Sequence, residues 1–227
     1  MVNPGGKHRF ANYFVRKKPG ESETGQNLGM IARSRTVTMT HHASTETVSL
    51  AALISRAERA GRGAPPVDRW NPDFCGDIDM VIKADGTWLH EGTPIRREAL
   101  KRLFSSVLRK DEDGRTYLVT PVEKLKITVE DAPFIAVEMS GGDGEAGATL
   151  TFRTDVGDVV EAGEEHPIRF AVTEDGAFRP YLLVRGRLEA ALTRALAYDL
   201  AGLIQEDERG LYLSSNGARF DVPRDVA

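Results

Sequence analysis

The sequence has little of what most reaction centres need. Its 227 residues include a single cysteine, Cys75, which excludes an internal disulfide and a Cys-rich zinc site. Of its five histidines, only His90 and His166 lie beyond residue 45, too few for a convincing metal centre. Uninterrupted apolar runs extend over a few residues only, whereas a membrane-spanning helix needs roughly 20. These absences favour a soluble protein of the cytoplasm, without a metal site and with no cofactor that the sequence identifies.

Positive charge is scarce outside the start of the chain. Residues 1–38 hold seven Lys or Arg against two Glu, whereas the other residues hold 23 basic and 32 acidic side chains. An acidic body does not favour binding to a nucleic-acid polymer, because phosphate backbones need clustered positive potential. The basic start lacks the apolar segment of a signal peptide, so residues 1–45 are expected to be a disordered tail. Met1, Met30 and Met39 are alternative translation starts.

The spacing of apolar residues and the positions of Gly and Pro divide the rest of the chain into segments. Four apolar residues between positions 50 and 57 recur at helical spacing, and the Gly- and Pro-rich stretch GRGAPP follows them. A short helix and a linker are therefore predicted over residues 46–66. Two lobes are expected after the linker, an N-terminal lobe over residues 67–130 and a C-terminal lobe over residues 131–227.

Internal similarity gives the fold prediction. IDMVIKADGTW, residues 78–88, is similar to IRFAVTEDGAF, residues 168–178, at a constant offset of ninety. Each segment alternates apolar and polar residues up to an Asp-Gly turn, which is typical of a β-hairpin. Apolar stripes then predict a helix that buries residues between Ala99 and Leu108 and a second helix over about residues 187–203. The sequence thus predicts an α+β protein of two similar lobes from an internal duplication, each an antiparallel sheet with one main helix.

Further strand-like segments lie between the two similar segments. SGGDGEAG, residues 140–147, is glycine-rich but lacks the Lys-Ser/Thr of a phosphate-binding loop and precedes a strand, so it is interpreted as a hairpin loop. The expected strands are residues 125–129, 134–139, 149–153 and 158–161.

Candidate catalytic side chains are few. Asp77 and Asp79 stand two apart on an expected strand, so they share one face and could divide acid and base roles or hold a metal. Neither has a nearby His motif or a third acidic ligand, which favours solvated carboxylates. Cys75 would need a basic partner to act as a nucleophile. A buried or inert thiol is the alternative.

Arginines gather where the helices are expected to begin. Arg96 and Arg97 precede the first helix, and Arg185 and Arg187 precede the second. A cation in the first turn of a helix typically costs about 0.3–1 kcal/mol against the helix dipole. One hypothesis is that Arg97 and Arg185 converge on an anionic ligand. The alternative is salt bridging within an acidic protein.

Several segments in order resemble the bacterial family known as domain of unknown function 1285. The resemblance runs from about Trp70 to the end of the chain. It is carried by RWNPDFCGDIDMVI, DGTWLHEGTPI, LFSSVLRKDEDG, YLVTPVEK, VEDAPF and RPYLLVRGRLEAALTRALAYDL.

The resemblance implies a duplicated core whose second lobe is loosely similar to pleckstrin-homology folds. It also implies a ligand site between the lobes, for an anionic, nucleotide-like small molecule, and a role in signalling. The family segments that would face such a site contain Thr93, Arg97, Glu123, Lys124, Tyr181, Arg185 and Arg194.

Together the sequence and the resemblance predict a non-catalytic protein that binds a small ligand between its lobes. Two alternatives stay open. One is a protein–protein interaction module without a small ligand, and the other is an enzyme that uses Asp77 and Asp79 or Cys75.

Overall fold

A computed structural model describes residues 65–144, 147–173 and 176–223. The expected basic tail over residues 1–45 and all but the last two residues of the expected helix and linker lie outside the described residues. Everything below belongs to the compact unit Glu46–Ala227. The described part of the chain opens with the short 3₁₀ helix η1, Val67–Arg69.

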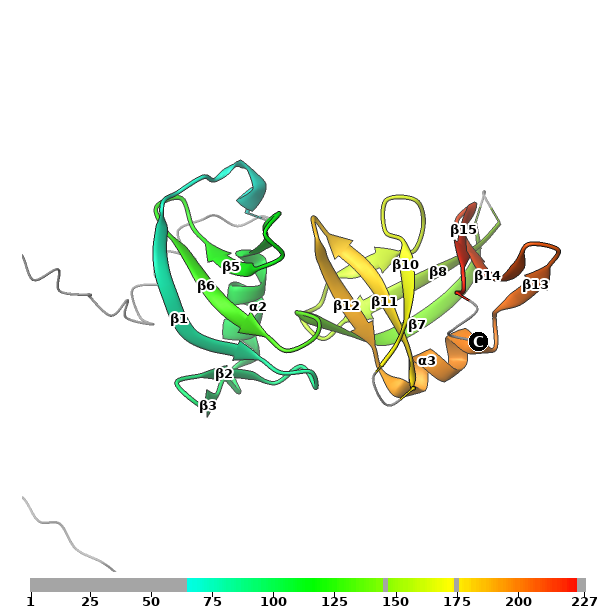
Figure 1. Ribbon diagram of the computed structural model, residues 1–227, viewed down its shortest axis with the longest axis horizontal. Coiled ribbons are helices and arrows are strands. Elements are labelled where there is room, and N and C mark those ends of the chain that lie inside the picture. The colour runs from blue at the N-terminus through cyan, green and yellow to red at the C-terminus, as the bar shows by residue number, and fades with distance from the viewer. Residues whose placement is uncertain (1–64, 145–146, 174–175, 224–227) are drawn as a thin grey trace, which may run out of the picture. The chain divides into compact units, whose positions relative to one another are not determined.

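The first sheet has six strands in the order β3-β2-β1-β6-β5-β4 (Figure 1). Its strands are β1 (Phe74–Ile82), β2 (Trp88–His90), β3 (Thr93–Pro94), β4 (Leu108–Lys110), β5 (Thr116–Val119) and β6 (Lys124–Val129). In β1 the buried Met80 and Ile82 alternate with the exposed Asp77 and Asp79, as the sequence predicts.

The second sheet also has six strands, in the order β10-β11-β12-β7-β8-β9. They are β7 (Phe134–Gly144), β8 (Gly147–Thr154), β9 (Val159–Glu161), β10 (Ile168–Val172), β11 (Phe178–Arg185) and β12 (Leu188–Leu192). All four of the segments expected between the similar hairpins contain strands. The stretch SGGDG, expected in a hairpin loop, instead forms the end of β7.

The two sheets share one topology. Numbered within its own lobe, each sheet has the order 3-2-1-6-5-4, because β1–β6 and β7–β12 follow the same path. The offset of ninety in the sequence pairs different strands, since residues 78–88 supply strands 1 and 2 of the first sheet and residues 168–178 supply strands 4 and 5 of the second. Two similar lobes are confirmed, but the hairpin-to-hairpin alignment is wrong: both segments carry only the general pattern of a hairpin.

Neither sheet is purely antiparallel, which corrects the sequence prediction. β1 pairs with β6 in parallel, and β12 pairs with β7 in parallel, whereas the neighbouring strands along each meander are antiparallel. A parallel pair needs a long connection between its strands. In each lobe, the four strands between the first and the last provide that connection.

Helix content is lower than the apolar stripes predict. The first helix, α2 (Glu98–Ser106), ends before Leu108, which begins β4. The second helix, α3 (Arg194–Ala201), is shorter than expected because residues 188–192 form β12. A turn at Gly186, with φ of 53°, closes the β11–β12 hairpin. Thr193 then caps α3 by accepting a hydrogen bond from the Leu196 backbone N–H.

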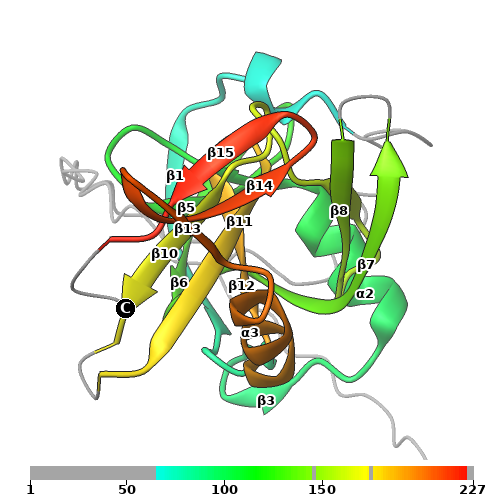
Figure 2. The ribbon, with the colours of Figure 1, turned by 90° about the vertical axis from the view of Figure 1, so that its right-hand side faces the viewer.

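A third sheet follows α3 and packs against the second. It consists of β13 (Gln205–Asp207), β14 (Gly210–Ser215) and β15 (Ala218–Asp221) (Figure 2). The buried Ser215 hydroxyl accepts from the Leu150 backbone N–H of β8 and donates to the Ala162 carbonyl, both at 2.8 Å. One hydroxyl therefore joins the third sheet to the second.

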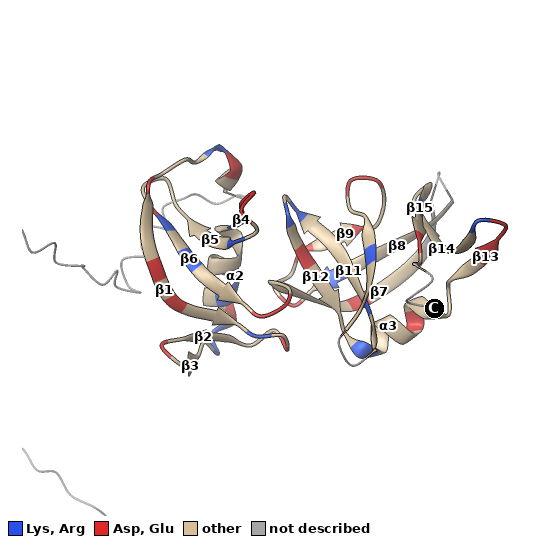
Figure 3. Cartoon of the chain, in the orientation of Figure 1, with Lys and Arg blue, Asp and Glu red and all other residues tan. Residues whose placement is uncertain are grey.

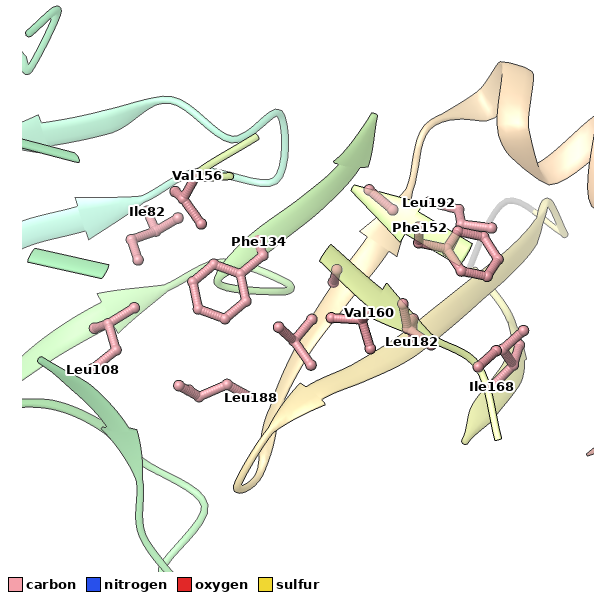
Figure 4. Close-up of a cluster of buried hydrophobic side chains, with 14 of the residues drawn as sticks. Ile82, Leu108, Phe134, Phe152, Val156, Val160, Ile168, Leu182, Leu188 and Leu192 are labelled. Carbon is pink, nitrogen blue, oxygen red and sulfur yellow. The ribbon is translucent and has the colours of Figure 1, made fainter. Parts of the chain in front are cut away.

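One continuous core contains side chains from both six-stranded sheets. Phe134 of β7 lies in the same buried cluster as Ile82 and Leu108 of the first sheet and Leu188 of the second (Figure 4). Phe134, Ile82 and Leu108 are fully buried. None of the described helices is long and apolar enough to cross a membrane.

Gly86, in the β1–β2 turn, marks a close approach to the second lobe. Its φ is 83°, and a Cβ at this position would lie 2.8 Å from Ile135 Cγ1 of β7. Gly176, in the β10–β11 turn, has a φ of 80°, but a Cβ there would have no other atom within 4 Å. The two glycines thus share a backbone conformation and differ in what surrounds them.

Replacing Gly86 with Ala should destabilise the protein more than replacing Gly176 with Ala. Both variants place a side chain at positive φ, at a cost of about 1–3 kcal/mol, but only Gly86→Ala also collides with Ile135, which adds about 1–3 kcal/mol. Urea unfolding followed by circular dichroism measures the difference. Equal losses of unfolding free energy for the two variants would show that a side chain at position 86 does not collide with Ile135.

Candidate functional site

A cavity of about 760 Å³ with a mainly apolar lining lies beside α3. We call it the α3 cavity. Ala84 and Asp85 of the β1–β2 turn line it together with side chains of the second lobe and the third sheet. Its apolar lining includes Ile135, Phe178, Leu192, Ala197, Tyr198, Ile204 and Leu211. A volume of this size and a mostly apolar lining are typical of small-molecule sites.

A few polar groups stand among the apolar residues of the α3 cavity. Arg194 lines it and lies over the Tyr198 ring, with 5.7 Å between the guanidinium carbon and the ring centroid. Arg179 also lines it and forms an ion pair with Asp131 at 2.6 Å through Nη2. The Nε of Arg179 is buried and has no acceptor among the described residues. The cavity therefore offers two cations, whereas the Arg179 Nε itself is buried within the protein.

A smaller cavity of about 430 Å³ lies beneath the β1–β2 turn. We call it the turn cavity. Trp88, Arg96 and Lys101 line it from the first lobe, and Asp155 lines it from the second. It shares Asp85, Ile135 and Thr193 with the α3 cavity, so the two adjoin.

A third cavity, of about 920 Å³, is lined mainly by charged side chains. It includes Asp111, Glu112 and Asp113 of the turn after β4, and Arg185 and Arg187 near the β11–β12 turn. A fourth, of about 540 Å³, contains Glu161, Glu164, Glu165 and His166. No group of three His, Cys, Asp or Glu side chains in the described ranges has the arrangement needed to hold a metal ion.

The seven residues that the family resemblance assigned to a site do not gather in one cavity. Arg194 lines the α3 cavity and Arg185 lines the charged one, whereas the other five line none of these four. Thr93 is exposed in β3, and Arg97 is the exposed N-cap residue of α2.

Tyr181 and Lys124 take part in separate networks. The Tyr181 hydroxyl donates to Asp131 at 2.7 Å, and Arg169 lies 4.1 Å above its ring. Burial and the Asp131 contact raise the pKa of Tyr181 to about 12, so the phenol remains a hydrogen-bond donor. Lys124 begins β6 and contacts Asp111 at 3.3 Å. Glu123, in the turn before β6, donates its backbone N–H to Thr120 Oγ1.

The expectation that Arg97 and Arg185 begin equivalent helices and converge there on an anion does not fit the positions of the two residues. Arg185 ends β11 instead of beginning a helix, and it pairs with Asp158 of its own lobe at 2.6 Å. Its Nη2 donates to the Ser105 carbonyl near the C-terminus of α2, whereas Arg97 precedes the N-terminus of that helix. Eight residues along a helix span about 12 Å. Arg187 likewise lies before β12 and pairs with Glu112. The salt-bridge alternative therefore describes Arg185 and Arg187.

The candidate catalytic residues line none of the four cavities. Asp77 pairs with Lys126 at 2.5 Å, and Figure 3 shows acidic residues of β1 beside basic residues of β6. Asp79 is exposed, and so is Cys75, whose thiol donates to the Asp73 carbonyl at 3.3 Å. Of the expected buried or inert thiol, burial is wrong, because Cys75 is exposed.

Sequence reasoning missed Phe178, Arg179, Thr193 and Tyr198 as site residues. Phe178 was assigned only to a hairpin, because an aromatic residue after a turn is an ordinary strand signal. Thr193 and Tyr198 were placed inside one long helix. The Thr193 N-cap would have revealed the true helix start and the end of the preceding strand.

Asp111 helps to attach the start of the described chain to the first sheet. It accepts hydrogen bonds from Arg109 Nε at 2.6 Å and from Lys124 Nζ at 3.3 Å. Arg109 in turn donates to the carbonyls of Val67 and Trp70. Burial alone would raise the pKa of Asp111, but the bonds from Arg109 and Lys124 outweigh it and lower the pKa below its ordinary value.

Asp111→Asn should lower the unfolding free energy by about 1–3 kcal/mol at pH 7, because it weakens the three charge-assisted hydrogen bonds from Arg109 and Lys124. A lowered folded-state pKa stabilises the protein above the unfolded-state pKa of about 3.9, and this stabilisation is lost as pH falls through the folded-state value. The gap between wild type and variant should thus persist down to about pH 4 and close below it.

Urea unfolding between pH 7 and pH 3 measures that gap. The exposed Glu112 provides the control, since Glu112→Gln should change stability by less than about 0.5 kcal/mol. A gap for Asp111→Asn that stays constant through acid pH would contradict a role for its charge.

Comparisons with known proteins agree with this architecture. The chain matches the N-terminal domain of a family described as "Domain of unknown function (DUF1285)" over residues 65–132. The C-terminal domain of the same family matches residues 133–222. No curated protein matches the chain.

Two solved structures are similar to the chain. The crystal structure of a DUF1285 family protein from Silicibacter pomeroyi DSS-3 is 47% identical and has a TM-score of 0.68, covering 74% of this chain and 92% of that chain. One from Shewanella baltica OS155 is 28% identical and has a TM-score of 0.45, covering 55% of this chain and 91% of that chain. Both domains of the family are thus present in order, and the chain belongs to the DUF1285 family.

Proposed function

We propose that this protein binds a small amphipathic anion in the α3 cavity and does so without catalysing a reaction. The observation that carries the proposal is the presence of two cations, Arg179 and Arg194, in the lining of an otherwise mainly apolar cavity of about 760 Å³. An anionic group on the ligand would interact with this positive charge, and an apolar body would fill the remaining space.

The lining of the cavity fits an aromatic or other planar ligand. Phe178 and Tyr198 provide aromatic surface, and Tyr198 is 65% exposed at the cavity beside α3. Arg194 places positive charge next to that ring. A nucleotide-like molecule, which the family resemblance implies, combines a planar ring with negative charge and belongs to this ligand class.

A signalling role would follow from where the cavity lies. Ala84 and Asp85 come from the first lobe, whereas most of the lining comes from the second lobe and α3. A ligand in contact with both would stabilise the state in which both contacts form, by an amount set by its affinity for that state. Such a ligand could report its own concentration through the contacts of the β1–β2 turn.

The two alternatives have less support. An enzyme that used Asp77, Asp79 or Cys75 would need these residues beside a cavity, and none of them lines the four described above. Exposed large apolar side chains, which an interaction module would need, come from separate elements: Phe74, Val122, Val159, Val172, Tyr198 and Leu203.

We also propose that the two lobes descend from one duplicated unit. Their common strand order, with a parallel pair between the first and the last strand, supports this origin. The second lobe adds α3 after its last strand. That sheet-then-helix order supports the looser comparison with pleckstrin-homology folds.

Two matched dyes test the ligand class. Anilinonaphthalene sulfonate has an apolar body and one anionic group, and phenylnaphthylamine is its neutral counterpart. Both should bind the wild-type protein with increased fluorescence. Arg194→Gln should weaken the sulfonate about threefold to tenfold and leave the neutral dye unchanged, because only the sulfonate gains a charge-assisted contact.

A second pair of variants tests the location. Ala201 lines the α3 cavity, whereas the exposed Ala195 of the same helix does not. Ala201→Phe should weaken both dyes by about tenfold or more by filling the cavity, and Ala195→Phe should change neither. Near-ultraviolet circular dichroism checks that both variants keep their tertiary packing. Equal dye binding by the two variants would place the dyes elsewhere and refute the proposed site.

A further inference from the structure

Two exposed apolar side chains lie at the same end of the first sheet. Phe74, at the start of β1, is 56% exposed, and Val122, in the turn before β6, is 64% exposed. Although they come from separate elements, β1 pairs with β6 so that Phe74 lies opposite Lys124, two residues after Val122. The exposed Pro121 precedes Val122. We call Phe74, Pro121 and Val122 the Phe74 surface.

Phe74 belongs to the outer face of the first sheet. Its ring meets the Tyr117 ring of β5 edge to face, with 6.2 Å between the ring centroids. The next residue of β5, Leu118, belongs to the buried core, and neighbouring residues of a strand point to opposite faces of a sheet. Phe74 and Tyr117 therefore lie on the face away from the core, where the described residues leave Phe74 more than half exposed.

The described part of the chain begins close enough for the preceding segment to reach this surface. Arg109 of β4 donates to the Val67 and Trp70 carbonyls, so the start of the described chain is fixed beside β4. β1 is three strands away from β4 in the sheet, which is about 14 Å at the usual strand spacing. From Ala60 to Pro65 an extended chain spans about 17 Å. A helix that ends near Ala60 can therefore lie on the Phe74 surface.

The segment before the linker has an apolar stripe that needs a partner. Leu50, Leu53, Ile54 and Ala57 fall on one face at helical spacing. A single helix of about 15 residues is marginal in water unless its apolar face packs on another surface. The compact unit that contains both lobes begins at Glu46, the first residue of this segment. Packing against a lobe would bury the stripe.

We propose that residues 46–60 form a helix that packs its apolar stripe on the Phe74 surface. Phe74 and Val122 are the large exposed apolar side chains of the first lobe in the described ranges. The others belong to the second lobe: Val159, Val172, Tyr198 and Leu203. The Phe74 surface is thus an internal docking surface, occupied by the chain itself and closed to other proteins. This docking does not depend on a ligand in the α3 cavity.

Hydrogen–deuterium exchange of the full chain, read by mass spectrometry, tests the docking. Backbone amides of residues 46–60 should exchange at least about tenfold more slowly than in an unfolded peptide. Val122→Asp should lower that protection about tenfold, because a carboxylate disfavours burial beneath apolar side chains. Val159→Asp is the matched control, since Val159 is 66% exposed in the second sheet, and it should leave the protection unchanged.

Leu53→Asp and Ser55→Asp supply a second matched pair within the segment itself. Leu53 belongs to the apolar stripe, whereas Ser55 falls on the opposite face at helical spacing. Leu53→Asp should lose the protection and Ser55→Asp should keep it. Unchanged slow exchange in β7 shows that a variant keeps its folded core, and Val122→Ser takes the place of Val122→Asp if the latter does not.

Three results would overturn the inference. One is peptide-like exchange of residues 46–60 in the wild type. Another is equal protection in Val122→Asp and Val159→Asp, because the segment would then pack elsewhere. The third is protection that rises with protein concentration together with a dimer in light scattering, which would make a second copy the occupant. Ligand binding in the α3 cavity is tested separately by the two dyes.

Discussion

The guanidinium group of Arg185 makes the contact on which the arrangement of the described elements depends. It pairs with Asp158, donates to the Ser105 carbonyl near the end of α2, and lies 4.7 Å above the centroid of the Phe134 ring. A cation at a helix C-terminus is favoured by the helix dipole. One side chain of the second lobe thus satisfies the helix of the first and covers the ring at the centre of the common core.

The candidate ligand sites follow from that junction. The β1–β2 turn can lie close to Ile135 because Gly86 has no side chain. Asp155 accepts hydrogen bonds from the Lys101 side chain and from the Ile135 backbone N–H. These contacts place Asp85 in the lining of both the α3 cavity and the turn cavity. Arg179 and Arg194 line the α3 cavity, and Trp88 lines the turn cavity. The contacts between the lobes therefore also shape the two cavities.

Local sequence patterns predicted where the strands lie, but they did not predict which strands pair with each other. Alternation along β1 and β10 was visible because burial in a sheet repeats every two residues. Pairing depends on contacts distant in sequence, so the parallel neighbours β1 and β6 left no local signal, and two unrelated hairpins looked like copies. In the sequence, the apolar residues of β12 and α3 looked like one helix, because a short apolar run fits the period of a strand as well as that of a helix. Arg194, a residue of the family segments, lines the α3 cavity, but no local pattern could show that Ala84 and Asp85 of the β1–β2 turn line it as well.

Scanning calorimetry of the full chain would show whether the two lobes share one core and unfold together. One transition is predicted, with a calorimetric enthalpy equal to the van't Hoff enthalpy, because the cluster around Phe134 contains residues of both six-stranded sheets. Two resolved transitions, or a calorimetric enthalpy near twice the van't Hoff value, would show that the lobes unfold independently and do not depend on a shared core.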